Sequence, residues 1–116
     1  MKNNKTFCFD IDGVIATITP VSRYDEAKPI RSTVALINRL HARGHRIVLF
    51  TARGSMTGID WSKVTRRQMK AWGVKHHELR FGKPAADYYV DDRMITVARA
   101  RVLSRARPSK KRSAKR

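Results

Sequence analysis

The strongest constraint on the fold is an alternation of short apolar runs with segments of helical periodicity. Phe7–Phe9 and Arg46–Phe50 are apolar runs of the length expected for buried strands. Between them, Val34, Ile37 and Leu40 recur at the spacing of a helix that buries one face. Because alternating strands and helices form a parallel sheet with right-handed crossovers, the sequence predicts an α/β domain.

The second half of the chain continues this alternation. We expect a helix from Trp61 to Trp72, strands at Glu78–Phe81 and Tyr88–Val90, and a final helix from Met94 to Val102. The residues between the first strand and Pro29 are expected to form a small hairpin or flap over the end of that strand. A chain of 116 residues has room for one domain. We place this domain at residues 1–103 and a basic, disordered tail at residues 104–116.

Two carboxylates stand where the first strand ends. Asp10 closes the apolar run, Asp12 follows two residues later, and Gly13 allows the backbone to bend sharply toward a ligand. A buried charge is costly unless it is paired or bound to a metal, and ligands of open α/β sheets sit at the carboxyl ends of strands. Taken alone, the stretch from Asp10 to Gly13 is equally compatible with an Asx-type turn.

Positive charge is the second unusual property of the sequence. The formal net charge is +17, and the segment Ser104–Arg116 holds seven of the 26 basic residues and no acidic one. A polyanionic partner or substrate would relieve the mutual repulsion of so many like charges. The tail is interpreted either as a solvated end or as an arm that adds nucleic-acid affinity through counterion release. It contains no aromatic residue, so base stacking by the tail is not expected.

Composition and the N-terminal segment indicate where the protein works. The hydrophobic content of 41% is sufficient for a core, and the single cysteine, Cys8, is expected to be a small buried hydrophobe within the first strand. The first six residues lead directly into that strand and leave no room for a signal peptide, and no apolar run approaches membrane-spanning length. We therefore expect a cytoplasmic protein with no membrane contact.

Polar side chains at the later strand ends decide how the two aspartates are interpreted. Thr51 ends the second predicted strand, Asp91 and Asp92 end the fourth, and Lys83 stands just before the fourth. A carboxylate can attack phosphorus, and a second carboxyl group can protonate the leaving oxygen. Hard oxygen ligands suit Mg²⁺, and a hydroxyl and an ammonium group can hold phosphate oxygens. The strand ends therefore predict phosphoryl transfer.

These residues resemble the four motifs of the haloacid-dehalogenase-like (HAD) phosphohydrolases. The resemblance covers about residues 6 to 103. The motifs are Asp10-Ile11-Asp12-Gly13, Thr51, Lys83 and Asp91-Asp92, in this order along the chain. One departure is minor, because Val14 stands where many members have threonine. The resemblance implies a three-layer, Rossmann-like fold with a central parallel sheet.

The resemblance also implies a role for each residue. Asp10 would be the nucleophile and Asp12 the general acid and base. Mg²⁺ would be bound by Asp10, by the backbone carbonyl of Asp12 and by Asp91 or Asp92, with the choice between the last two left open. The expected phosphate-binding residues are Thr51, Ala52, Arg53 and Lys83. For Arg53 a salt bridge within its own loop is an equal alternative.

The substrate is the least determined part of the prediction. About 16 residues separate Gly13 from Ile30 and about 31 separate Thr51 from Lys83, so neither gap holds a cap domain. Capless relatives tend either to oligomerise or to accept large substrates with an exposed phosphate. Residues 82–93 are similar to small bacterial and phage members linked to capsule or sugar-phosphate metabolism, and Asp91-Asp92-Arg93 is similar to the phosphatase half of phage polynucleotide kinases.

From these features we expect a Mg²⁺-dependent phosphomonoester hydrolase that acts through an aspartyl-phosphate on a small phosphorylated substrate, a sugar phosphate or a nucleotide. Two alternatives remain. The first is a phosphatase for the 3′ or 5′ ends of polynucleotides, which would use the basic surface and tail. The second is a non-catalytic nucleic-acid-binding protein on the same scaffold.

Overall fold

The computed structural model describes residues 4–83, 86–89 and 93–105. Its strands and helices are β1 (Thr6–Asp10), α1 (Arg31–Ala42), β2 (Arg46–Thr51), α2 (Ser62–Ala71), β3 (Glu78–Phe81) and α3 (Val97–Arg105), with two short 3-10 turns, η1 (Pro20–Ser22) and η2 (Tyr24–Glu26), after β1. The alternation of strand and helix predicted from the sequence is confirmed. The last helix begins at Val97 rather than at Met94 and continues to Arg105.

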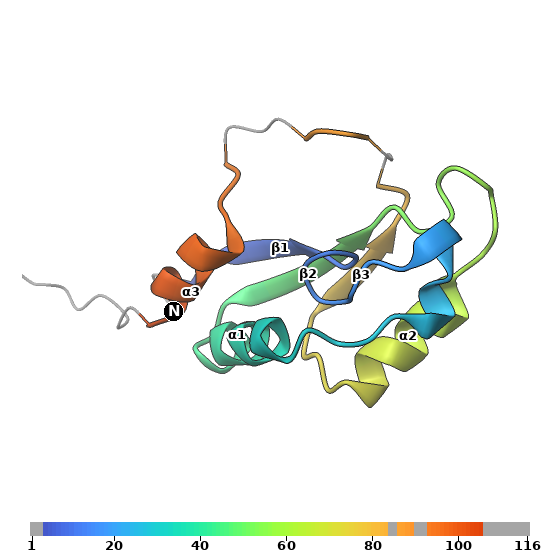
Figure 1. Ribbon diagram of the computed structural model, residues 1–116. Coiled ribbons are helices and arrows are strands. Elements are labelled where there is room, and N and C mark those ends of the chain that lie inside the picture. Colours follow the sequence, from blue (N-terminus) through green and yellow to red (C-terminus); the bar gives the residue numbers. More distant parts are fainter. Residues whose placement is uncertain (1–3, 84–85, 90–92, 106–116) are drawn as a thin grey trace, which may run out of the picture.

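The described strands form one parallel sheet in the order β1-β2-β3. Helices α1 and α2 lie on the same side of this sheet, and α3 lies beside α1 (Figure 1). This arrangement follows from the order of the strands, because right-handed crossovers that all step in one direction place every connecting helix on one face. The parallel α/β architecture is therefore present, and a third layer on the opposite face stays a prediction.

The fourth strand expected at Tyr88–Val90 is not found in the described part of that segment. Tyr88 and Tyr89 have no strand conformation, and 87% and 40% of their surfaces are exposed. The prediction was wrong for these two residues, because their side chains are exposed and do not pack against the sheet. Val90 lies outside the described residues.

The hydrophobic core lies between one face of the sheet and helix α1. Phe9 of β1 and Leu49 of β2 are register partners that point to this face, and both are buried. Leu36, Ile37 and Leu40 of α1 meet them with at most 1% of their surfaces exposed. Each such side chain contributes about 1.5–3 kcal/mol when fully buried. This packing fixes β1 and β2, whose carboxyl ends carry the candidate site.

The prediction that Cys8 is buried was wrong. Successive side chains of a strand point to opposite faces. Phe7 and Phe9 therefore turn toward the helices, and Cys8 turns to the other face, where it is exposed. The apolar run Phe7–Phe9 was interpreted as a buried strand, but no described helix covers the face of β1 that carries Cys8 (Figure 1).

The segment after β1 forms the expected flap. Ala16 and Pro29 form an antiparallel bridge, and the backbone N–H of Thr17 donates to the carbonyl of Lys28 at 2.8 Å. The amide of Lys28 donates in turn to the Thr17 hydroxyl at 2.9 Å. Turns η1 and η2 form the tip of this hairpin. The hairpin places η2 against α2, close to the carboxyl ends of β1 and β2.

No helix in the described ranges is both long and apolar enough to cross a membrane.

Candidate active site

A tight turn after β1 presents Asp10 and Asp12 at the carboxyl edge of the sheet. Ile11, between them, is fully buried, and its carbonyl accepts hydrogen bonds from the amides of Val14, Ile15 and Ala16 at 3.2, 2.8 and 2.9 Å. Burial of Ile11 leaves the two flanking aspartates partly exposed. The turn also requires a left-handed backbone at Gly13, where φ is +87°.

Asp10 is bound by one cation and remains partly open to solvent. Its Oδ1 accepts the backbone N–H of Ile11 at 2.9 Å, and its Oδ2 lies 3.3 Å from the Nζ of Lys83. The exposed fractions of the two side chains are 34% for Asp10 and 16% for Lys83. Lys83 also lies over the ring of Tyr89, with 3.9 Å between Nζ and the ring centroid. Asp10 thus has a cation beside it and one open side.

Asp12 is bound much more tightly, by the guanidinium of Arg53. The Nε of Arg53 donates to Oδ2 and Oδ1 of Asp12 at 3.0 and 3.3 Å, and its Nη2 donates to Oδ1 at 2.9 Å. The Arg53 side chain is completely buried, and 25% of the Asp12 side chain is exposed. Oδ2 accepts one of these bonds and Oδ1 two, so a lone-pair site on Oδ2 remains for a proton.

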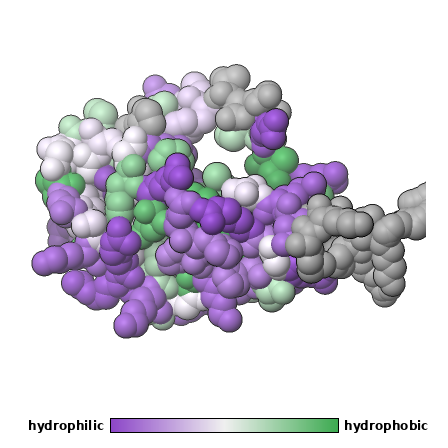
Figure 2. All heavy atoms as spheres, turned by 180° about the vertical axis from the view of Figure 1, so that it is seen from behind, coloured by the Kyte–Doolittle hydropathy of each residue, from purple (hydrophilic) through white to green (hydrophobic). Residues whose placement is uncertain are grey.

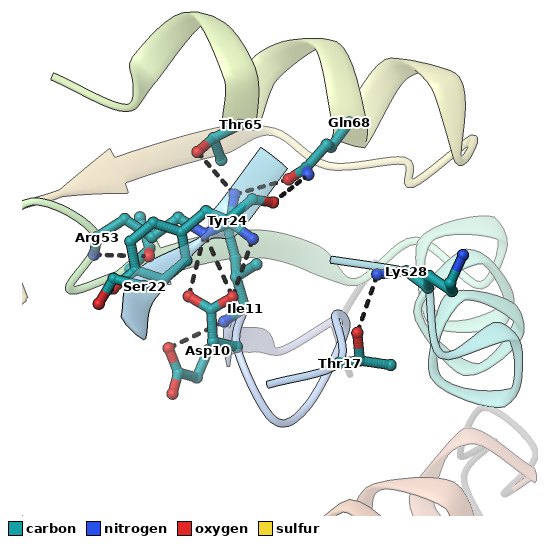
Figure 3. Close-up of polar contacts among 11 residues, drawn as sticks. Asp10, Ile11, Thr17, Ser22, Tyr24, Lys28, Arg53, Thr65 and Gln68 are labelled. Atoms are coloured by element: carbon teal, nitrogen blue, oxygen red, sulfur yellow. Dashed lines mark hydrogen bonds and ion pairs between the residues drawn. The ribbon is translucent and has the colours of Figure 1, made fainter. Parts of the chain in front are cut away.

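Helix α2 and the flap hold Arg53 from behind. Its Nη1 donates to Thr65 Oγ1 at 3.0 Å and to Gln68 Oε1 at 2.7 Å. Gln68 Nε2 donates to the backbone carbonyl of Tyr24 at 2.7 Å, and the Arg53 guanidinium lies 4.8 Å from the centroid of the Tyr24 ring. Figure 3 shows Thr65, Gln68 and Tyr24 converging on Arg53. A buried charge needs such partners. Here α2, turn η2 and the turn after β1 that carries Asp12 supply them together.

The loop after β2 is shaped so that Arg53 can reach inward. Gly54 has a φ of +84°, and a Cβ at this position would lie 2.2 Å from the carbonyl oxygen of Ile59. Only glycine allows the loop to fold back so closely. The chain leaves β2 through Gly54, passes over the Ile59 carbonyl and enters α2, so that Arg53 and α2 lie next to each other.

The ends of β2 and β3 are joined to each other. Thr51 is fully buried, its hydroxyl accepts the backbone N–H of Arg53 at 3.0 Å, and its carbonyl accepts the backbone N–H of Lys83 at 3.1 Å. The hydroxyl of Ser55 donates to the Lys83 carbonyl at 2.8 Å. These bonds hold the Lys83 backbone beside the end of β2. They explain how a residue that follows β3 reaches Asp10 on β1.

A pocket of about 240 Å³ opens in front of these residues. Asp10, Asp12, Ala52, Arg53 and Tyr24 border it. Its volume is below the roughly 300–1,000 Å³ that is typical of pockets for whole small molecules. The pocket therefore suits a compact group, such as a phosphate, rather than an entire metabolite.

The structure brings together six of the eight residues that the sequence predicted for the site. They are Asp10, Asp12, Thr51, Ala52, Arg53 and Lys83. The other two, Asp91 and Asp92, lie outside the described residues. Of the alternatives for Arg53, the structure contains the salt bridge, although its partner is Asp12 rather than a residue of its own loop. Direct phosphate binding by Thr51, Ala52, Arg53 or Lys83 stays a prediction.

The donors present suit a hard cation only in part. Asp10 offers a partly exposed carboxylate, whereas both oxygens of Asp12 are bound by Arg53. Within the described ranges no three His, Cys, Asp or Glu side chains gather closely enough to hold a metal ion. A complete Mg²⁺ site would therefore need further oxygen ligands, and the sequence predicted these at positions 91 and 92.

Sequence reasoning missed Thr65 and Gln68. Both lie within the helix that was expected from Trp61 to Trp72, on the face that also carries Met69 and Trp72. Thr65 is fully buried and Gln68 half-buried, between the apolar positions of that face. Polar residues on the buried side of a helix need a hydrogen-bond partner. That requirement is the signal that could have pointed to a buried charge near α2.

Comparisons with known proteins support the fold. No protein-family model matches the chain, and no curated protein matches it. Among solved structures, a crystal structure of a target protein from Vibrio cholerae has a TM-score of 0.75 and 22% sequence identity, over 84% of this chain and 87% of that one. The structure of the Pnkp1/Rnl/Hen1 complex matches with a TM-score of 0.57 and 16% identity, over 76% of this chain and 31% of that one. At these identities, the likeness shows a shared fold.

Proposed function

We propose that this protein is a phosphomonoester hydrolase that uses Asp10 as its nucleophile and Asp12 as its general acid and base. The observation that carries the proposal is the unequal binding of the two carboxylates at one sheet edge. Asp10 is partly open beside Lys83, and Asp12 is fixed by a buried arginine. Two carboxylates in different environments are a common arrangement for dividing nucleophilic and acid–base roles.

The proposed reaction has two steps, formation and hydrolysis of an aspartyl-phosphate. The carboxylate of Asp10 attacks phosphorus, the bond from phosphorus to the leaving oxygen breaks, and Asp12 gives that oxygen its proton. An aspartyl-phosphate remains on Asp10. Asp12 then accepts a proton from water as the water attacks, and inorganic phosphate and free Asp10 are released.

Lys83 and Arg53 contribute differently to these steps. The ammonium group of Lys83 lies beside the attacking carboxylate, where it would also contact a phosphate oxygen and reduce the repulsion between two anions. Arg53 keeps the Asp12 carboxyl group in one orientation, so the group does not have to be ordered during each turnover. In this proposal Arg53 is a positioning residue and Lys83 contacts the substrate.

The proposed cofactor is Mg²⁺, for which the described residues supply only part of the ligands. Asp10, the backbone carbonyl of Asp12 and either Asp91 or Asp92 would hold it. When bound, Mg²⁺ supplies charge neutralisation for the phosphate group. The resemblance to HAD phosphohydrolases supports this assignment. The carboxylate of Asp10 also supports it, because this group is partly exposed and can therefore be reached by a cation.

Two substrate classes share this chemistry. The sequence favoured a small sugar phosphate or nucleotide. The fold likeness to a chain of the Pnkp1/Rnl/Hen1 complex and the sequence similarity to the phosphatase half of phage polynucleotide kinases are compatible with the alternative, a polynucleotide end. A basic surface of α2, described below, is a specific structural observation in favour of that second class.

The test is release of inorganic phosphate from a panel of substrates. The panel contains an aryl phosphate, sugar phosphates, nucleotides and oligonucleotides phosphorylated at the 3′ or 5′ end, each with Mg²⁺ and with EDTA. We expect Mg²⁺-dependent turnover of at least one substrate and none in EDTA. An absence of turnover across the whole panel would contradict the proposed function and would favour a binding protein on this scaffold.

A further inference from the structure

Helix α2 has two polar faces. Its inner face carries Thr65 and Gln68, which hold Arg53. Its outer face carries four cations, and together we call them the α2 basic stripe: Lys63, Arg66, Arg67 and Lys70. Their spacing of i, i+3, i+4 and i+7 places all four along one line of the helix. All four are exposed.

The charges of the stripe are not balanced by ion pairs. Among the described residues, none of the four takes part in an ion pair, although Arg23, Arg46, Arg53, Arg80 and Lys83 all do. The acidic residue nearest in sequence, Asp60, accepts the backbone N–H of Ser62 at 2.9 Å. Hydrogen bonds from Ser62 are the main reason why the pKa of Asp60 is lowered, and Lys63 contributes less.

Such a stripe is unfavourable for the helix itself. Cations at i, i+3 and i, i+4 repel each other, and Lys63 lies in the first turn, where the helix dipole disfavours positive charge. By contrast, the arginines of α1 are used within the fold, since Arg31 donates to the carbonyl of Trp72 and Arg39 donates to Ser104. Apart from the contact of Arg66 with the Phe81 ring, the stripe makes no such contact among the described residues, and an external anion would compensate its charge.

The stripe also begins next to the site. The guanidinium of Arg66 lies 5.7 Å from the centroid of the Phe81 ring, at the end of β3, two residues before Lys83. Trp61, directly before α2, packs edge-on against Tyr24, which borders the site pocket. Seen from behind, hydrophilic side chains gather along the lower edge of the molecule at the end that carries α2 (Figure 2). From this edge the stripe runs along the helix for about 10 Å.

The size of the pocket indicates what kind of anion fits. About 240 Å³ accommodates a terminal phosphate, so the remainder of a substrate must lie outside the pocket. A nucleic-acid strand has further phosphates at regular intervals beyond its end, about 3.4 Å apart along the axis of a duplex strand. Because the strand winds about the axis, its phosphates are farther apart through space than this axial rise, and a stripe about 10 Å long can contact about two consecutive phosphates.

We propose that the α2 basic stripe binds the phosphodiester backbone of a nucleic-acid strand whose terminal phosphate enters the pocket at Asp10. This inference rests on the proposed function and names its substrate class. Backbone contacts of this kind position a strand without reading its sequence. The protein would therefore act on polynucleotide ends with little preference for the terminal bases.

The test compares two variants with the same change in charge. The stripe variant carries Lys63→Gln, Arg66→Gln, Arg67→Gln and Lys70→Gln. The control variant carries Lys5→Gln, Arg43→Gln, Lys75→Gln and Arg99→Gln, of which Arg99 lies on α3 and the other three lie outside the helices and strands. Binding of a fluorescent, unphosphorylated single-stranded oligonucleotide is measured by anisotropy at several salt concentrations, and both variants keep residues 106–116. Far-UV circular dichroism and urea midpoints establish that both variants are folded.

We expect the stripe variant to lower the slope of log affinity against log salt by about 2, and to bind at least about tenfold more weakly near 0.1 M salt. The control variant should keep most of the wild-type slope. For hydrolysis, the stripe variant should lose turnover of a phosphorylated oligonucleotide at low substrate concentration and keep turnover of an aryl phosphate. The aryl phosphate does not extend along α2.

The outcomes separate this inference from the proposed function. If the wild-type protein hydrolyses an aryl phosphate but the two variants bind the oligonucleotide equally, the stripe assignment is overturned and the proposed function stands. If nothing is hydrolysed but only the stripe variant loses binding, the proposed function fails and the nucleic-acid surface stands. Stripe-dependent binding to vesicles of anionic lipid, with no response to the oligonucleotide, would overturn the inference in favour of a membrane surface.

Discussion

Asp10 and Asp12 are two residues apart, and the structure treats them in opposite ways. Asp10 has one cationic neighbour, Lys83, at 3.3 Å, and about a third of its side chain is open to solvent. Asp12 is held by three hydrogen bonds from a completely buried arginine. A single turn thus presents one carboxylate that can approach a substrate and one whose direction is fixed by the fold.

Because of this difference, we expect the two aspartates to affect turnover and the free energy of unfolding to different extents. An ion pair that is partly exposed contributes little to the free energy of unfolding, typically about 0–1 kcal/mol. Breaking a buried pair is costly, because the partner is left as an uncompensated charge in the interior. Asp10 should therefore matter mainly for turnover, and Asp12 should matter for both turnover and folding.

The largest expected effect comes from exchanging each aspartate for asparagine. Asp10→Asn removes the attacking charge, so turnover of every phosphomonoester should fall to background, while the free energy of unfolding stays within about 1 kcal/mol of the wild-type value. Asp12→Asn keeps the nucleophile. It should reduce turnover of alkyl phosphates by about 10²–10⁴-fold and of aryl phosphates less, because an aryl leaving group hardly needs a proton.

Unfolding in urea completes that comparison. Asp12→Asn should destabilise the protein by about 2–3 kcal/mol, because Arg53 keeps a neutral acceptor but loses its counter-charge. Equal stability losses for the two variants would remove the contrast between an open and a fixed carboxylate. Robust Mg²⁺-dependent turnover by Asp10→Asn would contradict the assignment of the nucleophile.

A smaller effect is expected for Arg53→Lys. Lysine keeps the positive charge but cannot bind a carboxylate through two parallel N–H groups. If Arg53 positions Asp12, the variant should lose about tenfold in kcat for alkyl phosphates, less for aryl phosphates, and little in affinity for inorganic phosphate. If Arg53 instead binds the substrate phosphate directly, KM and the inhibition constant of phosphate should rise together for every substrate.

Gln68→Leu provides a graded control for that experiment. It removes one acceptor from Arg53 and one donor from the Tyr24 carbonyl, and leaves the contact between Arg53 and Asp12 in place. The same selectivity between alkyl and aryl leaving groups should appear, with a smaller amplitude than for Arg53→Lys. A uniform loss for all substrates would indicate that Gln68 only stabilises the flap.

The smallest expected effect is the pH dependence of stability, which concerns residues remote from both aspartates. Partial burial, followed by the nearby charges of His77 and Lys75, lowers the pKa of His41, and burial, Lys5 and Arg43 lower the pKa of His45. The folded protein then binds these protons less well than the unfolded chain does. Stability should be complete above about pH 6.5 and should decline as the pH falls below it.

Urea midpoints between pH 7.5 and 5 measure this decline. The variant His45→Gln keeps a polar side chain at the position where His45 Nδ1 accepts the backbone N–H of Lys5 at 3.0 Å. It should show a shallower decline than the wild type. A midpoint that rises as the pH falls would contradict the sign of the effect.

The sequence was most informative where period and burial agree. Strands β1, β2 and β3 and helix α1 were predicted from the spacing of their apolar residues. Residues such as Leu49 and Ile37 are buried in the structure, and their spacing along the chain allows only one way of burying them. The candidate residues at the strand ends were found because parallel strands end at one edge. Prediction failed at Cys8 and at Tyr88, where an apolar residue is exposed, since a local pattern does not show which sheet face is covered.

The supporting contacts of the site could not be predicted in the same way. Gln68 and Arg53 are 15 residues apart, and their contact depends on how closely the loop after β2 folds back at Gly54. That distance is a property of the assembled fold. The alternative for Arg53, salt bridge or phosphate ligand, was left open by the sequence for the same reason.

The exposed position of Cys8 makes the protein easy to observe. It is the single cysteine of the chain, it is accessible, and it lies on β1 two residues before Asp10. A thiol-reactive fluorophore would therefore attach at one defined place without any substitution, beside the pocket of about 270 Å³ that Cys8, Asp10 and Lys83 border. The wild-type chain thus carries its own attachment point for an optical reporter of substrate arrival.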